Sequence, residues 1–101
     1  MLEVAQFDVY KPSSGPLVVV VQHDLLDAAS TRVIIPLIAP DRLDPPMNAL
    51  NPSVEIDGRM LLVATQFIAT LSVAELGTKV GTLQSDRDRI TRAIDALLGS
   101  V

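Results

Sequence analysis

The residues of this chain best suited to chemistry lie close together, at His23, Asp24 and Arg32. An imidazole or a carboxylate can act as a general base, and a guanidinium can stabilise a phosphorane. This combination would suit a metal-independent ribonuclease. The structural alternative is that His23 and Asp24 end a strand and that Arg32 forms an ion pair, and the sequence alone favours it.

Other kinds of active site have less support. The chain has no cysteine, which excludes disulfides, thiolate nucleophiles and cysteine-bound metals. One histidine with Asp24 and Asp27 is too small a set to predict a metal site, and no motif selects a serine for a nucleophilic triad. The glycines are too dispersed to form a phosphate-binding loop. We therefore predict no metal, no cofactor and no catalytic residue.

The composition restricts the partners. At 101 residues the chain is expected to form one domain over residues 1–101. Eight basic residues are scattered among twelve acidic ones, and the net charge of −4 argues against nucleic acid as the main partner. No segment resembles a signal peptide or reaches the ~20 apolar residues of a membrane helix, so we expect a cytoplasmic protein with no membrane partner. A mean hydropathy of +0.39 indicates apolar surface buried between subunits.

The elements that position these residues are mostly short strands. Polar and apolar residues alternate over residues 6–10, which predicts a half-buried strand. Residues 17–21 form a continuous apolar run, typical of a strand buried on both faces. Residues 32–38 form a strand in which Pro36 indicates an edge or a bulge. Asp57 and Gly58 supply a type I′ turn between strands at residues 54–56 and 59–65, and residues 78–83 are expected to form a last strand.

The chain ends in an amphipathic helix. Ser85 is the expected N-cap and Gly99 the expected C-terminal stop. The apolar face recurs at helical spacing and consists of Ile90, Ala93, Ile94, Leu97 and Leu98. A capping box at residues 72–75 predicts one further helical turn. Together these elements predict a mainly β protein, a small twisted antiparallel sheet or partly open barrel with one C-terminal helix packed on it.

Several motifs in this arrangement resemble the CcdB family of toxins. The most specific is Val-Gln-x-Asp-Leu-Leu-Asp at residues 21–27, followed by Arg-x-x-Ile-Pro-Leu at residues 32–37. Residues 6–10 and 50–56, the positions Ala69, Val73 and Gly77, and residues 90–94 continue the resemblance, which covers nearly the whole chain.

The resemblance implies an SH3-like, partly open barrel of the CcdB and MazF type, and a homodimer. It implies a toxin of a type II toxin–antitoxin module that is not an enzyme but binds the A subunit of DNA gyrase and traps cleaved DNA. A cognate, CcdA-like antitoxin would neutralise the toxin. The two proteins together would repress their operon, so that DNA contact is indirect and made through the antitoxin.

The resemblance also assigns the gyrase contacts. They correspond to the apolar pair Leu25 and Leu26, to Asp95 where the family has Asn, and to the chain end. The end consists of Leu98, Gly99, Ser100 and Val101, and Gly99 stands where the family has Trp.

Two alternatives from the same fold remain open. One is a ribonuclease toxin of the MazF or Kid type that uses His23 and Arg32. The other is a diverged relative that is not toxic and only binds antitoxin.

Overall fold

The computed structural model describes residues 3–99. In that range the chain forms seven strands, five short 3-10 turns and one α-helix. The strands are β1 (Asp8–Lys11), β2 (Val18–Val20), β3 (Thr31–Ile38), β4 (Ser53–Ile56), β5 (Arg59–Val63), β6 (Ala69–Ser72) and β7 (Thr78–Thr82). The 3-10 turns are η1 (Asp24–Leu26), η2 (Pro40–Arg42), η3 (Thr65–Phe67), η4 (Val73–Glu75) and η5 (Gln84–Asp86), and the helix is α1 (Arg87–Leu98).

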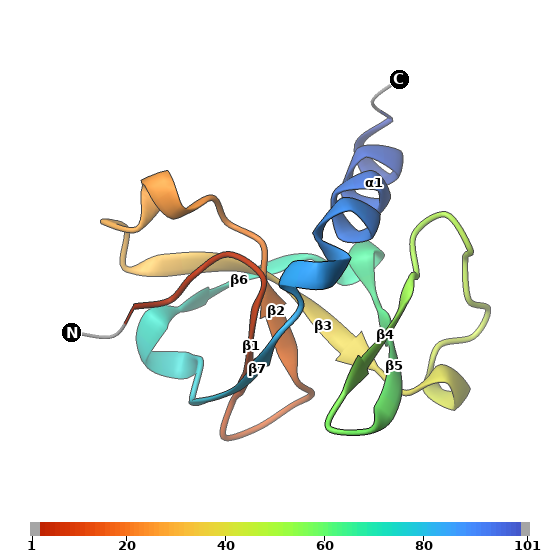
Figure 1. The fold of residues 1–101 in the computed structure, drawn as a ribbon, viewed down its shortest axis with the longest axis horizontal. Helices are drawn as coiled ribbons and strands as arrows, with labels where there is room; N and C mark the ends of the chain where they lie inside the picture. The colour runs from red at the N-terminus through yellow and green to blue at the C-terminus, as the bar shows by residue number, and fades with distance from the viewer. Residues whose placement is uncertain (1–2, 100–101) are drawn as a thin grey trace.

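The strands form one curled antiparallel sheet. Its order is β4-β5-β3-β2-β1-β7, and β6 pairs with the first half of β3. Figure 1 shows the sheet bent so that the β4–β5 hairpin rises on one side and β1, β2 and β7 lie on the other. This half-barrel with one C-terminal helix confirms the predicted fold class.

Pro36 does not mark an edge or a bulge, contrary to the expectation. Strand β3 is central, because it pairs with β2 on one side and with β6 and then β5 on the other. Pro36 lies opposite Val18, at the point where the partner changes from β6 to β5. Its carbonyl accepts from the Ala64 N–H at 2.9 Å. A missing N–H is tolerated here because no strand residue faces it in the gap between β6 and β5.

The first strand is shorter and more buried than predicted. It begins at Asp8 rather than residue 6, and residues 8–10 are all buried. Strand β1 lies between β2 and β7, and both of its faces are covered. Val9 belongs to one core cluster and Tyr10 to another on the opposite face. The alternation of polar and apolar residues could not predict that the second face of β1 is buried, because the residues that cover it come from distant parts of the chain.

The predicted turns are confirmed. Asp57 and Gly58 have φ values of 52° and 77°, as a type I′ turn requires, and they connect β4 to β5. The capping box at residues 72–75 opens η4, where the Ser72 N–H donates to Glu75 Oε1 at 2.9 Å. Hydrogen bonds from the backbone N–H of Ser72 and from its side chain lower the pKa of the Glu75 carboxyl group.

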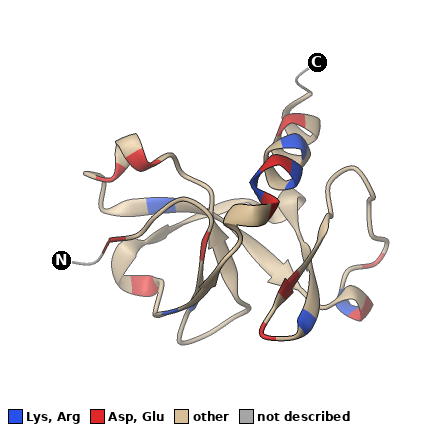
Figure 2. Ribbon diagram, in the orientation of Figure 1, with Lys and Arg blue, Asp and Glu red and all other residues tan. Residues whose placement is uncertain are grey.

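The C-terminal helix begins later than predicted and stands out from the sheet. Ser85 is not the N-cap, because η5 occupies residues 84–86 and α1 begins at Arg87. Gly99 ends the helix in the left-handed region with φ 71°. Leu98 was expected on the packed face but is 74% exposed, because this end of α1 extends beyond the sheet (Figure 1). Acidic and basic residues are mixed along the helix, as Figure 2 shows.

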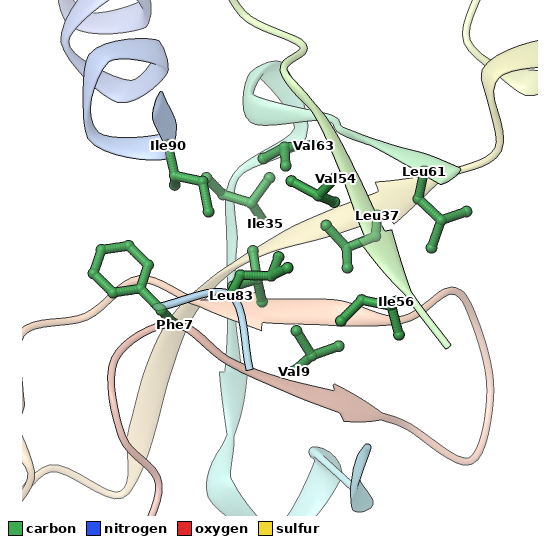
Figure 3. Packing of buried hydrophobic residues seen from close by; sticks show 11 residues of the cluster. Phe7, Val9, Ile35, Leu37, Val54, Ile56, Leu61, Val63, Leu83 and Ile90 are labelled. Atoms are coloured by element: carbon green, nitrogen blue, oxygen red, sulfur yellow. The ribbon is translucent and has the colours of Figure 1, made fainter. Parts of the chain in front are cut away.

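The main core lies between the curled sheet and the base of α1. Figure 3 shows Ile90 pointing down from the helix toward side chains from both sides of the sheet. The buried members of this cluster are Phe7, Val9, Val19, Ile35, Leu37, Val54, Ile56, Leu61, Val63, Leu83 and Ile90. A second cluster, on the other face of β1, β2 and β3, includes Val18, Val20 and Ile34. The two clusters explain why residues 17–21 are apolar without alternation.

Candidate functional site

The loop between β2 and β3 carries the candidate chemical residues. His23 caps η1, since its Nδ1 accepts from the Leu25 N–H at 3.0 Å. Asp24 Oδ1 accepts from the Gln6 N–H at 2.7 Å, which joins the loop to the N-terminal segment. Gln22 links the loop to β3, because its Nε2 donates to the Leu26 carbonyl and its Oε1 accepts from the Val33 N–H, both at 3.1 Å. The loop is therefore held at several points.

Arg32 lies at the start of β3 with its side chain turned back under this loop. The residue is only 5% exposed. Its guanidinium donates to the carbonyls of Asp27 and Thr31, each at 2.9 Å, and to that of Ala29. Among residues 3–99 it forms no ion pair with a carboxylate. Arg32 therefore bonds to backbone carbonyls of the loop and does not form the ion pair of the structural alternative.

An open cavity of about 570 Å³ lies beside Arg32. Its lining includes Glu3, Asp24, Asp27 and Arg32, together with Val4, Ala5, Ala29 and Val73. A guanidinium has five N–H donors, and the three bonds to backbone carbonyls occupy three of them. The other two donors have no acceptor among residues 3–99. The cavity thus combines a fixed cation with carboxylates that can accept a proton.

The geometry distinguishes between the two candidate bases. Nδ1 of His23 accepts a backbone N–H, so the proton of the neutral ring is on Nε2 and the basic lone pair is already engaged. The lining of the cavity includes Asp24 but not His23. The structure therefore brings Arg32 together with Asp24, and not with His23.

A buried polar group lies on β1, which β2 separates from β3. Asp8 is 4% exposed, and its Oδ2 lies 3.2 Å from Lys79 Nζ. Burial raises the pKa of Tyr10, and the negative charge of Asp8 raises it further. Lys79 and Arg32 act in the opposite direction. The side chain of Tyr10 is therefore a neutral phenol, and the positive charge of Arg32 acts on it.

The residues assigned by resemblance to a gyrase contact lie on two separate surfaces. Leu25 and Leu26 are 85% and 59% exposed on η1, which settles the open question of patch or core in favour of a patch. Asp95 and Leu98 are exposed on α1. Figure 1 places η1 and the end of α1 far apart, so one chain does not join them. The predicted contacts Ser100 and Val101 lie outside the described residues.

Residues 3–99 contain neither a metal-binding cluster nor a membrane-spanning helix. No group of three or more His, Cys, Asp or Glu is arranged to hold a metal ion. In the same range, no helix is both long enough and apolar enough to cross a bilayer.

Sequence reasoning missed two positioning roles. Gln22 was recognised only as part of a motif, although both ends of its amide fix the site loop to β3. Asp8 was expected on a half-buried strand, yet its carboxylate is buried beside Lys79. The specific spacing of the motif at residues 21–27 was the available signal for Gln22. Nothing in the local sequence pointed to Asp8.

The fold is shared with solved endoribonucleases. One is an endoribonuclease in complex with its cognate antitoxin from a mycobacterial species, with a TM-score of 0.78, 16% identity and coverage of 94% of each chain. Another is an endoribonuclease from a mycobacterial species, with a TM-score of 0.79 and 18% identity, covering 98% of this chain and 95% of that one. The expectation that the protein is not an enzyme is contradicted by these structures, because proteins of the same fold are endoribonucleases.

Sequence comparison supplies the family. A search of curated proteins finds no match. The model of a family described as CcdB protein matches residues 6–99, which are almost all of the chain. Together with the antitoxin complex of the similar structure, this match supports the predicted role in a toxin–antitoxin system. The chain therefore belongs to the CcdB family.

Proposed function

We propose that this protein is an endoribonuclease toxin of a type II toxin–antitoxin module. The observation that carries the proposal is Arg32, a buried guanidinium with no carboxylate partner among residues 3–99, on the wall of a cavity that also contains Asp24. Backbone carbonyls accept three of its hydrogen bonds, but no carboxylate in this range balances its charge, so an anionic ligand would find a buried cation here. The endoribonucleases of the same fold support this reading.

The chemistry is an internal transesterification of RNA. Asp24 takes the proton from a ribose 2′-hydroxyl, and the oxygen attacks the adjacent phosphorus. Arg32 stabilises the extra negative charge of the phosphorane through its two remaining N–H donors. The bond from phosphorus to the 5′-oxygen breaks, and this oxygen takes a proton from water. The products end in a 2′,3′-cyclic phosphate and a 5′-hydroxyl.

The electrostatics of the cavity restrict how RNA binds. Glu3 and Asp27 line it beside Asp24, and the whole chain has a net charge of −4. Carboxylates repel phosphate, so affinity depends on Arg32, the one cation among the described residues of the lining. We expect weak, slow cleavage of accessible single strands.

The test is a kinetic comparison of three proteins on a short RNA labelled at both ends. Arg32→Lys keeps the charge but loses the planar fork, and it should cut at least ~100-fold more slowly. Arg92→Lys, an exposed change on α1, is the matched control and should cut at the wild-type rate. Melting temperatures verify that all three are folded. Equal rates for Arg32→Lys and Arg92→Lys would refute the role of Arg32.

The proposal includes a homodimer and an antitoxin. Phe67 and Leu98 are 55% and 74% exposed, and η3 contacts α1, so apolar surface remains for a second copy. Light scattering should give a dimer that Phe67→Asp converts to a monomer.

The proposed antitoxin would bind the toxin in the cytoplasm and cover the cavity beside Arg32. The complex would repress its own operon through DNA contacts made by the antitoxin.

Gyrase poisoning is a second candidate, favoured by one observation. Leu25 and Leu26 form an exposed apolar pair on a well-anchored turn, which suits a protein partner better than RNA. A gyrase cleavage assay tests it: the wild type should trap cut DNA, and Leu25→Asp should not. If Leu25→Asp removes both trapping of cut DNA and toxicity while Arg32→Lys leaves both intact, gyrase is the target.

A further inference from the structure

A second cavity lies where the half-barrel fails to close. Its volume is about 400 Å³, and its lining comes from the β1–β2 turn, the β4–β5 hairpin, the segment between β3 and η2, and β7. Strands β4 and β7 are the two ends of the sheet order, so each has one edge that no described strand pairs with. We call this cavity the seam. Figure 1 shows the β1–β2 turn and the β4–β5 turn next to each other at the bottom of the view.

The floor of the seam is aliphatic. Leu37 and Leu61 belong to the main core and also line the cavity. Leu17 and Val80, partly buried and packed against that core, complete the floor. An apolar side chain placed here would continue the core and lose contact with water.

The rim of the seam is basic. Lys11, Arg42 and Arg59 line it, against the single carboxylate of Asp57. None of these three cations takes part in the ion pairs found among residues 3–99. A protein with a net charge of −4 thus has a local excess of positive charge at the seam. Such an excess attracts an anionic ligand.

The geometry points to an extended acidic peptide segment of a partner protein, with aliphatic side chains, as the ligand of the seam. Carboxylates would pair with Arg42 and Arg59, and a Leu or Val side chain would cover the floor. Strand β7, which contributes Val80 to the lining, has an unpaired edge that offers backbone groups to an extended chain. Single-stranded RNA fits less well, because its bases stack on aromatic side chains and none lines the seam. This inference is independent of the RNA cleavage proposed for the cavity at Arg32.

The test is the binding of a short fluorescent peptide of alternating Asp and Leu to the full-length protein, followed by anisotropy. The double variant Arg42→Glu with Arg59→Glu reverses the rim and should weaken binding at least about tenfold. The matched control, Arg87→Glu with Arg92→Glu, makes the same change in net charge on α1 and should bind as the wild type does. Binding should also weaken at raised ionic strength.

Three outcomes would overturn the inference. One is equal affinity of the rim variant and the control variant. Another is binding of a Lys-Leu peptide as tightly as the Asp-Leu peptide. The third is displacement of the peptide by an RNA oligonucleotide, with RNA binding abolished by the rim variant, which would make the seam an RNA site. All substituted residues are exposed, so melting temperatures near the wild-type value are expected.

Discussion

Of the five glycines in the chain, Gly77 should be the most damaging to replace by Ala. Gly77 has φ 77°, and a Cβ there would lie 2.1 Å from the carbonyl oxygen of Lys11 and 2.9 Å from its carbonyl carbon. These are backbone atoms of β1, so no side-chain rotation relieves the clash. Strand β1 must move away from β7, which pairs with it through Lys11 and Thr78.

The magnitude follows from three contributions. An L-residue in the left-handed region costs about 1 kcal/mol. Forcing atoms into a packed site costs typically ~1–3 kcal/mol, and each ladder hydrogen bond weakened by the movement costs ~1 kcal/mol. We expect Gly77→Ala to lower the free energy of unfolding by about 3–5 kcal/mol.

Gly58→Ala is the matched control for this prediction. Gly58 has the same φ of 77°, but nothing lies within 4 Å of an added Cβ. Gly58→Ala should therefore lower the free energy of unfolding only by the cost of the left-handed conformation, about 1 kcal/mol. Urea unfolding of both variants measures the difference. Equal losses in the two proteins would refute the conclusion that close approach of β1 makes Gly77 necessary.

Three further predictions concern the pH dependence, the cavity and the core. Because the folded state lowers the pKa of Glu75, its contribution to stability is present above the unfolded pKa and is lost as pH falls through the folded value; acid melting curves of Glu75→Gln should lack this loss. Asp27→Asn removes one carboxylate from the cavity and should tighten RNA binding several-fold at low salt, measured by filter binding, whereas unchanged affinity would argue against phosphate in this cavity. Ile90→Ala should cost about 2–5 kcal/mol and Leu98→Ala less than ~0.5 kcal/mol in denaturant titrations made in the monomeric Phe67→Asp background, because Ile90 is fully buried and Leu98 is 74% exposed; similar losses would contradict the described packing of α1.

The sequence predicted the elements whose signals are local. Asp57 and Gly58 define their turn by their own conformational preferences, and Gly99 ends a helix for the same reason. The β-branched run at residues 17–21 predicted a strand covered on both faces. Each of these signals lies within a few neighbouring residues.

Features that depend on distant segments could not be predicted in this way. Asp8 is buried because Lys79 and β7 arrive some seventy positions later in the chain. Pro36 fits a central strand because the partner of β3 changes beside it. The hydrogen bonds of Arg32 to three loop carbonyls depend on how the loop folds back, which residue types alone do not reveal. The expected absence of catalysis came from the residues as well as from the family resemblance, because no local motif selects a catalytic residue, and the endoribonucleases of the same fold contradict it.

The central claim is that Arg32 and Asp24 cleave RNA, and the ends of the products test it most directly. Purified protein is incubated with a defined single-stranded RNA in the presence of a chelator, and the fragments are identified by mass spectrometry. The account predicts fragments that end in a 2′,3′-cyclic phosphate and begin with a 5′-hydroxyl, and predicts their loss in both Asp24→Asn and Arg32→Lys. Intact RNA with the wild-type protein, or the same fragments from both variants, would contradict it.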